Sequence, residues 1–492
     1  MRQLQMDFIT NPVSARWIQI LNIIEQKPSF TLMKLSERLG VSQRTLLKDT
    51  QGIKEYFGES IGLYSKQSGF KFEIVDHILY MEKKSDIVES EILFDLIGKI
   101  FYGEKHSVQE LADEYSYAES TLRRFLTRTE KTLATYGLSF SYTPVSLIGD
   151  EGSIRKFLFD FYYSGEHTSH TICPPENLHS LVFERLSNTL GHYEIGSGAP
   201  PSMAYFLLYL VINRVKQNQL ISIPTWVQTK VVKEKDFQLL YSLQDDIAKE
   251  FNAMAPIEEF IWIYLILISQ RTMNHLDQEQ IFFERFNQDT LTSTIAESYF
   301  SNSKFDGWDR KNLENYLAAF LVSKTLLQSI HPVWNKQQVE EFEMVENKHG
   351  KAFRSNKQFL LKYRKKLNFE GPYFEDIVIS FTLFSELLFK VYQPKKKVLF
   401  LVEGDSLVTQ ALRHEAYQRL GNQHHLLFFQ LNDLVSKRIN SEKIDLIITN
   451  YRPYLINFES KRDYVLVNTV PNERDWSRVQ VKLNKYLDPF CL

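Results

Sequence analysis

The stretch of sequence that decides the fold occurs twice near the N-terminus. Residues 35–48 read LSERLGVSQRTLLK, and residues 111–124 read LADEYSYAESTLRR. The two stretches align without a gap at an offset of 76 residues, which indicates an internal repeat. Each copy predicts a short amphipathic helix, a tight turn at Gly40 or Ser116, and a second, longer helix.

A short β-hairpin is expected after each predicted helix pair. Residues 63–70 (LYSKQSGF) and 138–147 (LSFSYTPVSL) have strand-like composition, with turns at Gly69 and Pro144. Helix, turn, helix and hairpin in this order is typical of a winged helix-turn-helix domain. The sequence therefore predicts two such domains in tandem, at residues 1–75 and 86–165.

The rest of the chain divides into a helical part and a mixed part. Helical periodicity continues from residue 169 to residue 392 and predicts two all-helical domains, at 169–300 and 301–392. Its strongest predicted helices cover 203–216, 256–271, 313–330 and 374–391. Residues 395–492 alternate strand-like runs, at 398–402, 426–430, 444–449 and 464–468, with a helix at 407–420. Such alternation predicts a parallel α/β domain. Because the other predicted domains are mostly helical, the predicted fold class of the whole chain is multidomain and mainly α.

Composition excludes several classes of protein. The apolar runs at 205–212 and 260–268 are too short to cross a bilayer, and the first ten residues lack the apolar core of a secretory signal. Cys173 and Cys491 are isolated, so neither a zinc module nor a disulfide framework is expected. No phosphate-binding loop, dinucleotide fingerprint or hydrolase motif is present. We expect a cytoplasmic protein that is not an enzyme, with no membrane partner, metal or cofactor.

The charge distribution must be considered segment by segment. The 492 residues include 58 Lys+Arg and 60 Asp+Glu, a net charge of −2, and a nearly neutral chain is unusual for a nucleic-acid-binding protein. Residues 1–75, however, hold 10 Lys+Arg against 7 Asp+Glu, while residues 76–103 hold 3 against 6. Residues 121–131 hold four basic side chains and one acidic one. The predicted second helices are therefore locally basic.

The outer face of each second helix carries side chains suited to DNA. Arg, Lys and Gln reach base edges or phosphates in the major groove, and basic side chains on a wing can contact the backbone or minor groove. A solvated helix face is the alternative interpretation for a single helix, but a repeat with two wings favours DNA binding. The candidate DNA-binding residues are Gln43, Arg44, Thr45, Lys48, Gln51, Lys66, Lys71, Ser120, Thr121, Arg123, Arg124 and Arg128.

The chain resembles the Mga/AtxA class of transcriptional regulators of Gram-positive bacteria. The resemblance is carried by the tandem helix-turn-helix units, by residues 147–151 (LIGDE) with Ile154 and Arg155, and by the domain order. It implies that the helical domains are PRD-like, which means related to the regulation domains controlled by the sugar phosphotransferase system (PTS). It also implies an EIIB-like domain, similar to the enzyme IIB component of that system, at 395–492. It implies an activator of virulence, adhesion or carbohydrate-use genes that self-associates as a homodimer or higher oligomer. The implied partners are double-stranded promoter DNA, RNA polymerase and the PTS phosphocarrier protein.

Two departures from the family pattern concern phosphorylation. The family's template places regulatory histidines at Leu207, Leu317 and Ile266, so none is present there. The nearby His192, His275 and His331 are substitute candidates for regulatory phosphorylation, and ordinary surface or core histidines are the alternative.

The second departure is in the C-terminal domain. Enzyme IIB domains carry a nucleophilic cysteine where this chain has Glu403, and a carboxylate repels phosphate. We therefore expect a dimerisation or sensing domain in which Asp405 and Ser406 belong to a helix-capping loop. The basic residues at 357–366 are expected to form a solvated helix face. A PTS-linked RNA-binding antiterminator and a phosphotransfer protein are the alternative functions.

Overall fold

The structure is a computed structural model that describes residues 1–66, 69–187, 193–301, 305, 307–428, 444–454 and 463–483. The chain divides into two compact units. The first comprises Met1–Ser301, Lys311–Met344 and Lys351–Thr382, and the second comprises Asn302–Arg310, Val345–Gly350 and Leu383–Leu492. Each unit is described by itself below.

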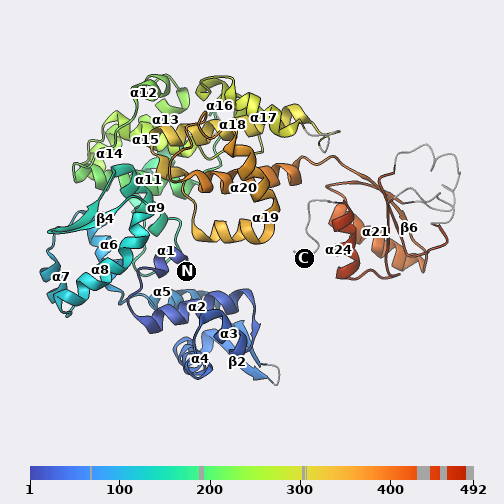
Figure 1. Ribbon diagram of the computed structural model, residues 1–492, viewed down its shortest axis with the longest axis horizontal. Coiled ribbons are helices and arrows are strands. Elements are labelled where there is room, and N and C mark those ends of the chain that lie inside the picture. Colours follow the sequence, from blue (N-terminus) through green and yellow to red (C-terminus); the bar gives the residue numbers. More distant parts are fainter. Residues whose placement is uncertain are drawn as a thin grey trace. The chain divides into compact units, whose positions relative to one another are not determined.

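The first repeat forms a helical pair with a three-stranded sheet (Figure 1). Its elements are α1 (Gln3–Met6), α2 (Pro12–Gln26), β1 (Ser29–Phe30), α3 (Leu32–Leu39), α4 (Gln43–Phe57), η1 (Gly58–Ser60), β2 (Ile61–Lys66), β3 (Gly69–Ile74) and α5 (His77–Asp86). The strands are antiparallel in the order β1-β3-β2. Gly40 ends α3 in the left-handed region at φ 65°, and the Ser42 side chain caps α4 by accepting from the Thr45 amide.

The second repeat has the same order of helices followed by an antiparallel pair of strands. It comprises α6 (Ile92–Tyr102), α7 (Val108–Glu114), α8 (Glu119–Ala134), β4 (Ser139–Tyr142), β5 (Val145–Ile148) and α9 (Glu151–Tyr162). Ser107 and Glu110 form a reciprocal capping box at the start of α7. Ser116, at the predicted turn, has φ 58° and separates α7 from α8. The helices and hairpins therefore occur in the predicted order in both copies.

The described residues between 176 and 391 are helical apart from the connections between helices. Their helices are α10 (Glu176–Ser187), α11 (Pro201–Lys216), α12 (Thr225–Val231), α13 (Lys235–Tyr241), α14 (Gln244–Phe251), α15 (Ile257–Ile268), α16 (Leu276–Phe286), α17 (Leu291–Phe300), α18 (Arg310–Ile330), η3 (Pro332–Asn335), α19 (Val339–Leu361) and α20 (Phe374–Val391). The four strongest predicted helices correspond to α11, α15, α18 and α20. α15 is the most completely buried of these, because apolar side chains occupy nearly all of its positions.

A small parallel sheet is the core of the C-terminal segment. Its strands, β6 (Lys397–Leu401), β7 (His425–Phe428), β8 (Leu446–Thr449) and β9 (Tyr464–Leu466), have the order β7-β6-β8-β9. The helices α21 (Ser406–Leu420) and α24 (Glu473–Leu483) pack against it. The predicted mainly helical fold with a C-terminal parallel sheet is therefore confirmed, with strand ends shifted by one or two residues.

A buried ion-pair network joins α9 to the helical region within the first unit. The Arg155 guanidinium is fully buried and pairs with Glu259 at 2.5 Å and with Glu151 at 2.8 Å. Arg214 on α11 also pairs with Glu151, at 2.7 Å, and Arg155 donates to the Gln219 carbonyl oxygen. These contacts connect the last helix of the second repeat to both α11 and α15.

Candidate nucleic-acid interface

Helix α4 presents a polar outer face. Gln43, Arg44 and Lys48 are exposed at its N-terminal end, while Thr45 is half-buried and shares a hydrogen bond with the Ser42 hydroxyl. Gln51 is also exposed, and its side-chain amide donates to Glu55 at 3.0 Å. A recognition helix contacts bases with its N-terminal residues, so Arg44 and Lys48 are the better placed of these candidates.

The opposite face of α4 is fixed to α2. Asp49, which is 5% exposed, accepts two hydrogen bonds from Arg16 at 2.8 and 3.1 Å. Gly52 lies against Trp17, where an added Cβ would approach the indole ring to 2.6 Å. Because a bidentate ion pair and a close packing contact hold the helix, its outer side chains have a defined direction.

Helix α8 offers fewer free cations than the sequence suggests. Arg123 is exposed but pairs with Glu119 at 2.7 Å and lies over the Tyr142 ring of the hairpin. Arg128 donates to the carbonyl oxygen of Ile9, so its guanidinium is engaged in the fold. Arg124 is exposed, as is Ser120, and Thr121 is half-buried. Arg124 is the cation on this helix best placed for a phosphate.

The first hairpin carries two candidate basic side chains, Lys66 and Lys71. Lys71 on β3 is 44% exposed at its side chain and pairs with Glu73 at 3.2 Å, which lowers its availability to phosphate. The predicted contact at Lys66 lies outside the residues whose side chains the structure describes. The first wing therefore supplies one described cation, Lys71.

The two repeats are fastened to each other by polar contacts. Glu91, 1% exposed and located just before α6, accepts from the Thr10 amide at 2.6 Å and from the Asn11 amide at 3.1 Å. Thr132 of α8 donates to Asp7 at 2.7 Å. The acidic residues between the two repeats therefore do more than lower the net charge. One of them, Glu91, holds the start of α2.

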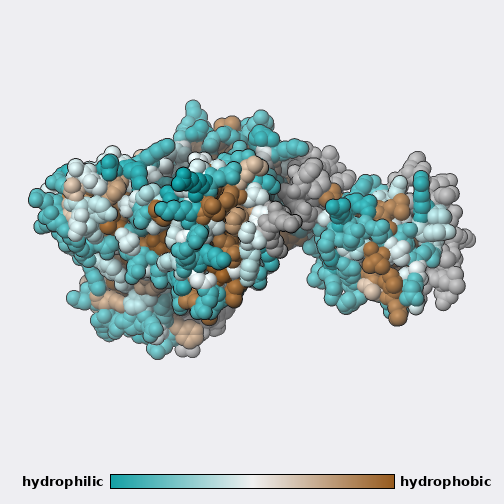
Figure 2. Space-filling model, turned by 90° about the horizontal axis from the view of Figure 1, so that it is seen from below, coloured by the Kyte–Doolittle hydropathy of each residue, from teal (hydrophilic) through white to brown (hydrophobic). Residues whose placement is uncertain are grey.

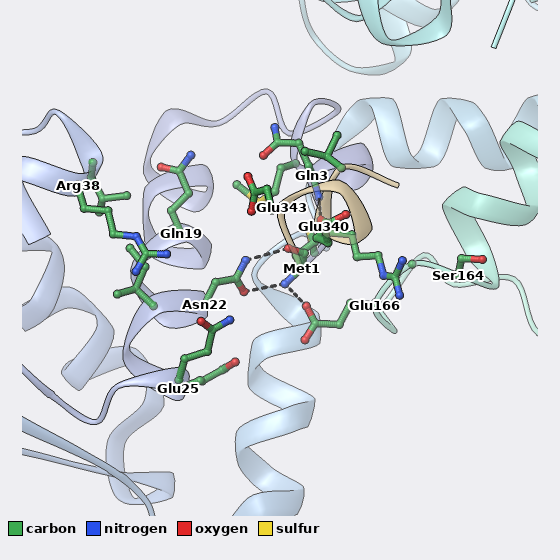
Figure 3. Close-up of a pocket in the computed structure, with 17 residues that line it drawn as sticks. Met1, Gln3, Gln19, Asn22, Glu25, Arg38, Ser164, Glu166, Glu340 and Glu343 are labelled. Atoms are coloured by element: carbon green, nitrogen blue, oxygen red, sulfur yellow. Dashed lines mark hydrogen bonds and ion pairs between the residues drawn. The ribbon is translucent and has the colours of Figure 1, made fainter. Parts of the chain in front are cut away.

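A second set of ion pairs and hydrogen bonds lies beside an acidic pocket (Figure 3). Lys84 of α5 pairs with Glu25 of α2 at 2.9 Å and with Glu166, which follows α9, at 2.7 Å. Burial alone would lower the pKa of Lys84, but its hydrogen bonds to the two glutamates raise the pKa above its usual value. The Met1 ammonium also contacts Glu166 and donates to Asn22. The acidic side chains Glu25 and Glu166 make this pocket unsuited to a phosphate.

The candidate regulatory histidines lie in different settings. His331 is 8% exposed and lies 3.1 Å from Asp150, the N-cap of α9. Burial lowers the pKa of His331, and Asp150 opposes that shift. His275 is exposed at the start of α16, whereas His192 lies outside the described residues. Of the described candidates, His275 is the one accessible to a modifying protein.

The structure adds side chains to the candidate interface that the sequence analysis missed. Lys34 on α3, Lys54 on α4 and Thr127 on α8 are exposed. Thr127 could have been found from its spacing, because it follows Arg124 by three positions and shares its helix face. Lys34 lies on the first helix of the pair, which in this motif crosses the DNA backbone, so motif geometry was the available signal there.

The position of the family's cysteine has its own local structure. Glu403, two residues after the end of β6, accepts from the Tyr454 hydroxyl, and its backbone amide donates to Asn450 at 2.8 Å. Asp405 accepts from the Leu407 amide at 2.8 Å and caps α21, as expected. No cluster of metal-ligating side chains occurs among the described residues, and no described helix is long and apolar enough to cross a membrane.

Comparison with known proteins agrees with these local structures. Residues 14–69 match the M protein trans-acting positive regulator (MGA) HTH domain, and residues 76–162 match the Mga helix-turn-helix domain. The chain is 22% identical over 489 residues to the capsule synthesis positive regulator AcpA of Bacillus anthracis, covering 96% of this chain and 99% of that protein. It is 20% identical to AcpB of the same organism over 490 residues, covering 95% and 98%. The two matched domains and this full-length similarity support an Mga/AtxA-like regulator family for this chain.

Proposed function

We propose that this protein activates transcription by binding promoter DNA through α4 and α8. The observation that carries the proposal is the exposed pair Arg44 and Lys48 on a helix whose other face is fixed by Asp49. In this arrangement α4 enters a major groove and β2 and β3 contact the backbone, while Arg124 places α8 on a second segment. The names of the two capsule regulators support the positive sign of regulation.

Phosphate contacts supply most of the affinity in this proposal. We expect Arg44→Ala combined with Lys48→Ala to weaken promoter binding at least tenfold at fixed salt, because two cations of the docking helix are lost. The slope of log K against log salt should also fall by about two. A gel-shift titration at several salt concentrations measures both quantities.

The control for this experiment is Lys365→Ala combined with Lys366→Ala, which removes two exposed lysines far along the chain from either repeat. Unchanged promoter affinity in the Arg44 and Lys48 variant would exclude α4 as a docking helix. Competition with hairpin RNA distinguishes the DNA-binding proposal from the antiterminator alternative. An equal concentration of hairpin RNA would displace an antiterminator from DNA, whereas a DNA-binding regulator would stay bound to the promoter.

We propose further that the protein self-associates through its C-terminal segment. Apolar side chains are exposed there, including Leu407 at 78% and Val470 at 70%, and Figure 2 shows hydrophobic residues gathered on the surface of that part. Self-association would place several DNA-binding units on one promoter and raise their effective concentration.

Removal of residues 395–492 tests self-association. We expect the truncated chain to sediment mainly as a monomer at concentrations where the full chain forms a dimer. The measurement is sedimentation velocity over a concentration series, with circular dichroism to establish that the helices remain folded. A truncated chain that still sediments as a dimer would place the interface elsewhere.

The regulatory part of the proposal concerns the helical region. We propose that residues 169–300 and 301–392 are PRD-like domains and that residues 395–492 are an EIIB-like domain without phosphotransfer activity. Phosphorylation by the PTS phosphocarrier protein is proposed at His275, because its side chain is exposed. The burial of His331 argues against the same role for that residue. RNA polymerase is the proposed partner for activation.

A further inference from the structure

A cationic pocket in the first unit has no role in the DNA-binding proposal. Its volume is about 610 Å³, which is within the range of small-molecule sites. α9, the helix that follows the second hairpin, forms one wall, and α18 and η3 supply others. Four cationic side chains line it against two acidic ones: Arg2, Lys156, Lys324 and Lys336 against Asp160 and Glu341.

The two acidic side chains are already engaged. Asp160 pairs with Lys156 on the same helix and accepts from the Tyr136 hydroxyl at 2.9 Å. Glu341 pairs with Arg2 at 3.1 Å. These two pairs leave the ammonium groups of Lys324 and Lys336 as the cations of the lining that make no ion pair among the described residues.

Lys324 is the most distinctive of these side chains. Its ammonium faces the Phe320 ring, 5.2 Å from the centroid, and makes no ion pair with any carboxylate among the described residues. Burial, and then repulsion from Lys156, lowers the pKa of Lys324 to about 8. Such a lysine destabilises the unliganded fold unless an anion joins it, because burial penalises an uncompensated charge.

Lys336 has a similar but less isolated position. Its ammonium lies 4.9 Å from the Tyr136 ring centroid, and burial lowers its pKa while Asp376 and Asp160 oppose the shift. Asp376 itself accepts from the Gln337 amide at 2.8 Å. Lys336 is therefore a second donor for an anion, with partial compensation from its neighbours.

The remaining lining favours an organic ligand over a bare ion. Phe159, Tyr163 and Trp334 supply aromatic surface, with the Phe159 and Trp334 rings 5.3 Å apart. The pocket also includes the amides of Gln270, Gln337 and Gln338 and the hydroxyls of Ser164 and Ser202. Aromatic faces pack against rings or apolar edges, and amides and hydroxyls bind sugar hydroxyls or ring nitrogens.

We propose that this pocket binds a small phosphate ester, with Lys324 and Lys336 holding the phosphoryl group and the aromatic wall holding the organic part. A doubly charged phosphoryl group suits two ammonium groups that make no ion pair among the described residues, and it accepts several hydrogen bonds from them. The acidic pocket beside Glu25 and Glu166 cannot serve in this way, because Glu340 and Glu343 line it as well and these carboxylates repel a phosphoryl group. Since α9 is the last helix of the second repeat and also forms one wall of the pocket, an occupied pocket would stiffen the attachment of the DNA-binding repeats.

Isothermal titration calorimetry of the full chain tests the proposal with three phosphate probes: inorganic phosphate, glucose 6-phosphate and AMP. Glucose and adenosine serve as uncharged controls. We expect at least one ester to bind more tightly than inorganic phosphate, and its uncharged counterpart to bind at least tenfold more weakly. Ester affinity should fall above pH 8, as free Lys324 loses its proton.

Matched variants locate the binding. Lys324→Met keeps the side-chain length and removes the charge, and we expect it to weaken the ester at least tenfold. Lys324→Arg, which restores the charge, should recover most of the affinity, while Lys365→Met at an exposed position should change nothing. The proposal would be overturned by no ester binding at millimolar concentration, by equal binding to Lys324→Met, or by equal binding of the uncharged counterpart. Binding of inorganic phosphate alone would also overturn it.

Discussion

Replacing Arg155 by methionine is expected to lower the free energy of unfolding of the first unit by about 3–5 kcal/mol. The substitution leaves Glu259, which is fully buried, without its cation, and the Gln219 carbonyl loses a donor. Glu151 keeps Arg214 as a partner, so the uncompensated charge is concentrated on Glu259. Urea unfolding followed by circular dichroism measures the change, and DNA affinity should fall with the folded fraction.

Two comparisons make the Arg155 prediction specific. Arg123→Met removes an exposed pair with the same i,i+4 spacing as Arg155 and Glu151, and it should change stability by less than about 0.5 kcal/mol. Arg155→Met combined with Glu259→Leu removes the buried charge and should recover a large part of the loss. If the single and double variants are equally unstable, the cost comes from lost packing over the Trp262 ring and not from an uncompensated charge.

Replacing Lys84 by methionine is expected to cost about 2–4 kcal/mol at pH 7, because two partly buried carboxylates lose their shared cation. Glu25 and Glu166 are 26% and 27% exposed at their side chains, so the loss should be smaller than for Arg155. Glu25 lies on α2 of the first repeat and Glu166 follows the last helix of the second, so we also expect the attachment between the two repeats to loosen. Hydrogen exchange at α2 and α5 measures that loosening, and urea unfolding measures the free energy.

The pH dependence of the Lys84 variant has a definite sign. Burial favours the neutral form of Glu166, but its bonds to Lys84 and to the Met1 ammonium lower its pKa below the usual value. The protein therefore has stability from this group above about pH 4.5, which is lost as the pH falls through the folded-state pKa. Without Lys84 that pKa rises, so the difference between the variant and the natural protein should shrink from pH 7 to pH 5.

The control for Lys84 is Lys99→Met. Lys99 contacts Asp95, Glu104 and Glu114, but these carboxylates are 45–46% exposed and remain hydrated when the lysine is removed. A loss of less than about 1 kcal/mol is expected. Equal losses of unfolding free energy in the Lys84 and Lys99 variants would contradict the expectation that burial of the carboxylates sets the size of the loss.

Much of the fold follows from local sequence, because its signals are periodic or positional. Ser42 as a helix cap and Gly40 as a left-handed stop mark one helix pair before any tertiary contact is known. The apolar run that forms β6, Lys397–Leu401, also indicates a strand of the parallel sheet from local sequence alone. Strand ends were less well predicted, because Ile444 is apolar but precedes the paired residues of β8.

The candidate interface was less predictable, since exposure and pairing depend on residues distant in sequence. Arg128 looks like a DNA-facing cation on its helix, yet its partner is the backbone of Ile9, 119 positions earlier. Arg123 is similar, because Tyr142 comes from the following hairpin. The cationic pocket could not be predicted at all, because Lys156, Lys324 and Lys336 come together only through the packing of α9 against α18 and η3.

The bonds that join the two repeats also constrain the promoter. Because Glu91 holds the start of α2 and Thr132 holds Asp7, we expect these bonds to restrict independent rotation of α4 and α8 along a DNA site. B-DNA repeats about every 10–10.5 base pairs, so two grooves contacted by one rigid body must stand at a fixed rotational phase. If the two groove segments were separated by an extra half turn, they would face opposite sides of the duplex. One molecule could then bind only one of them. In the proposed DNA-binding mode, we therefore expect the spacing within the operator to depend on these hydrogen bonds as well as on the side chains that touch the bases.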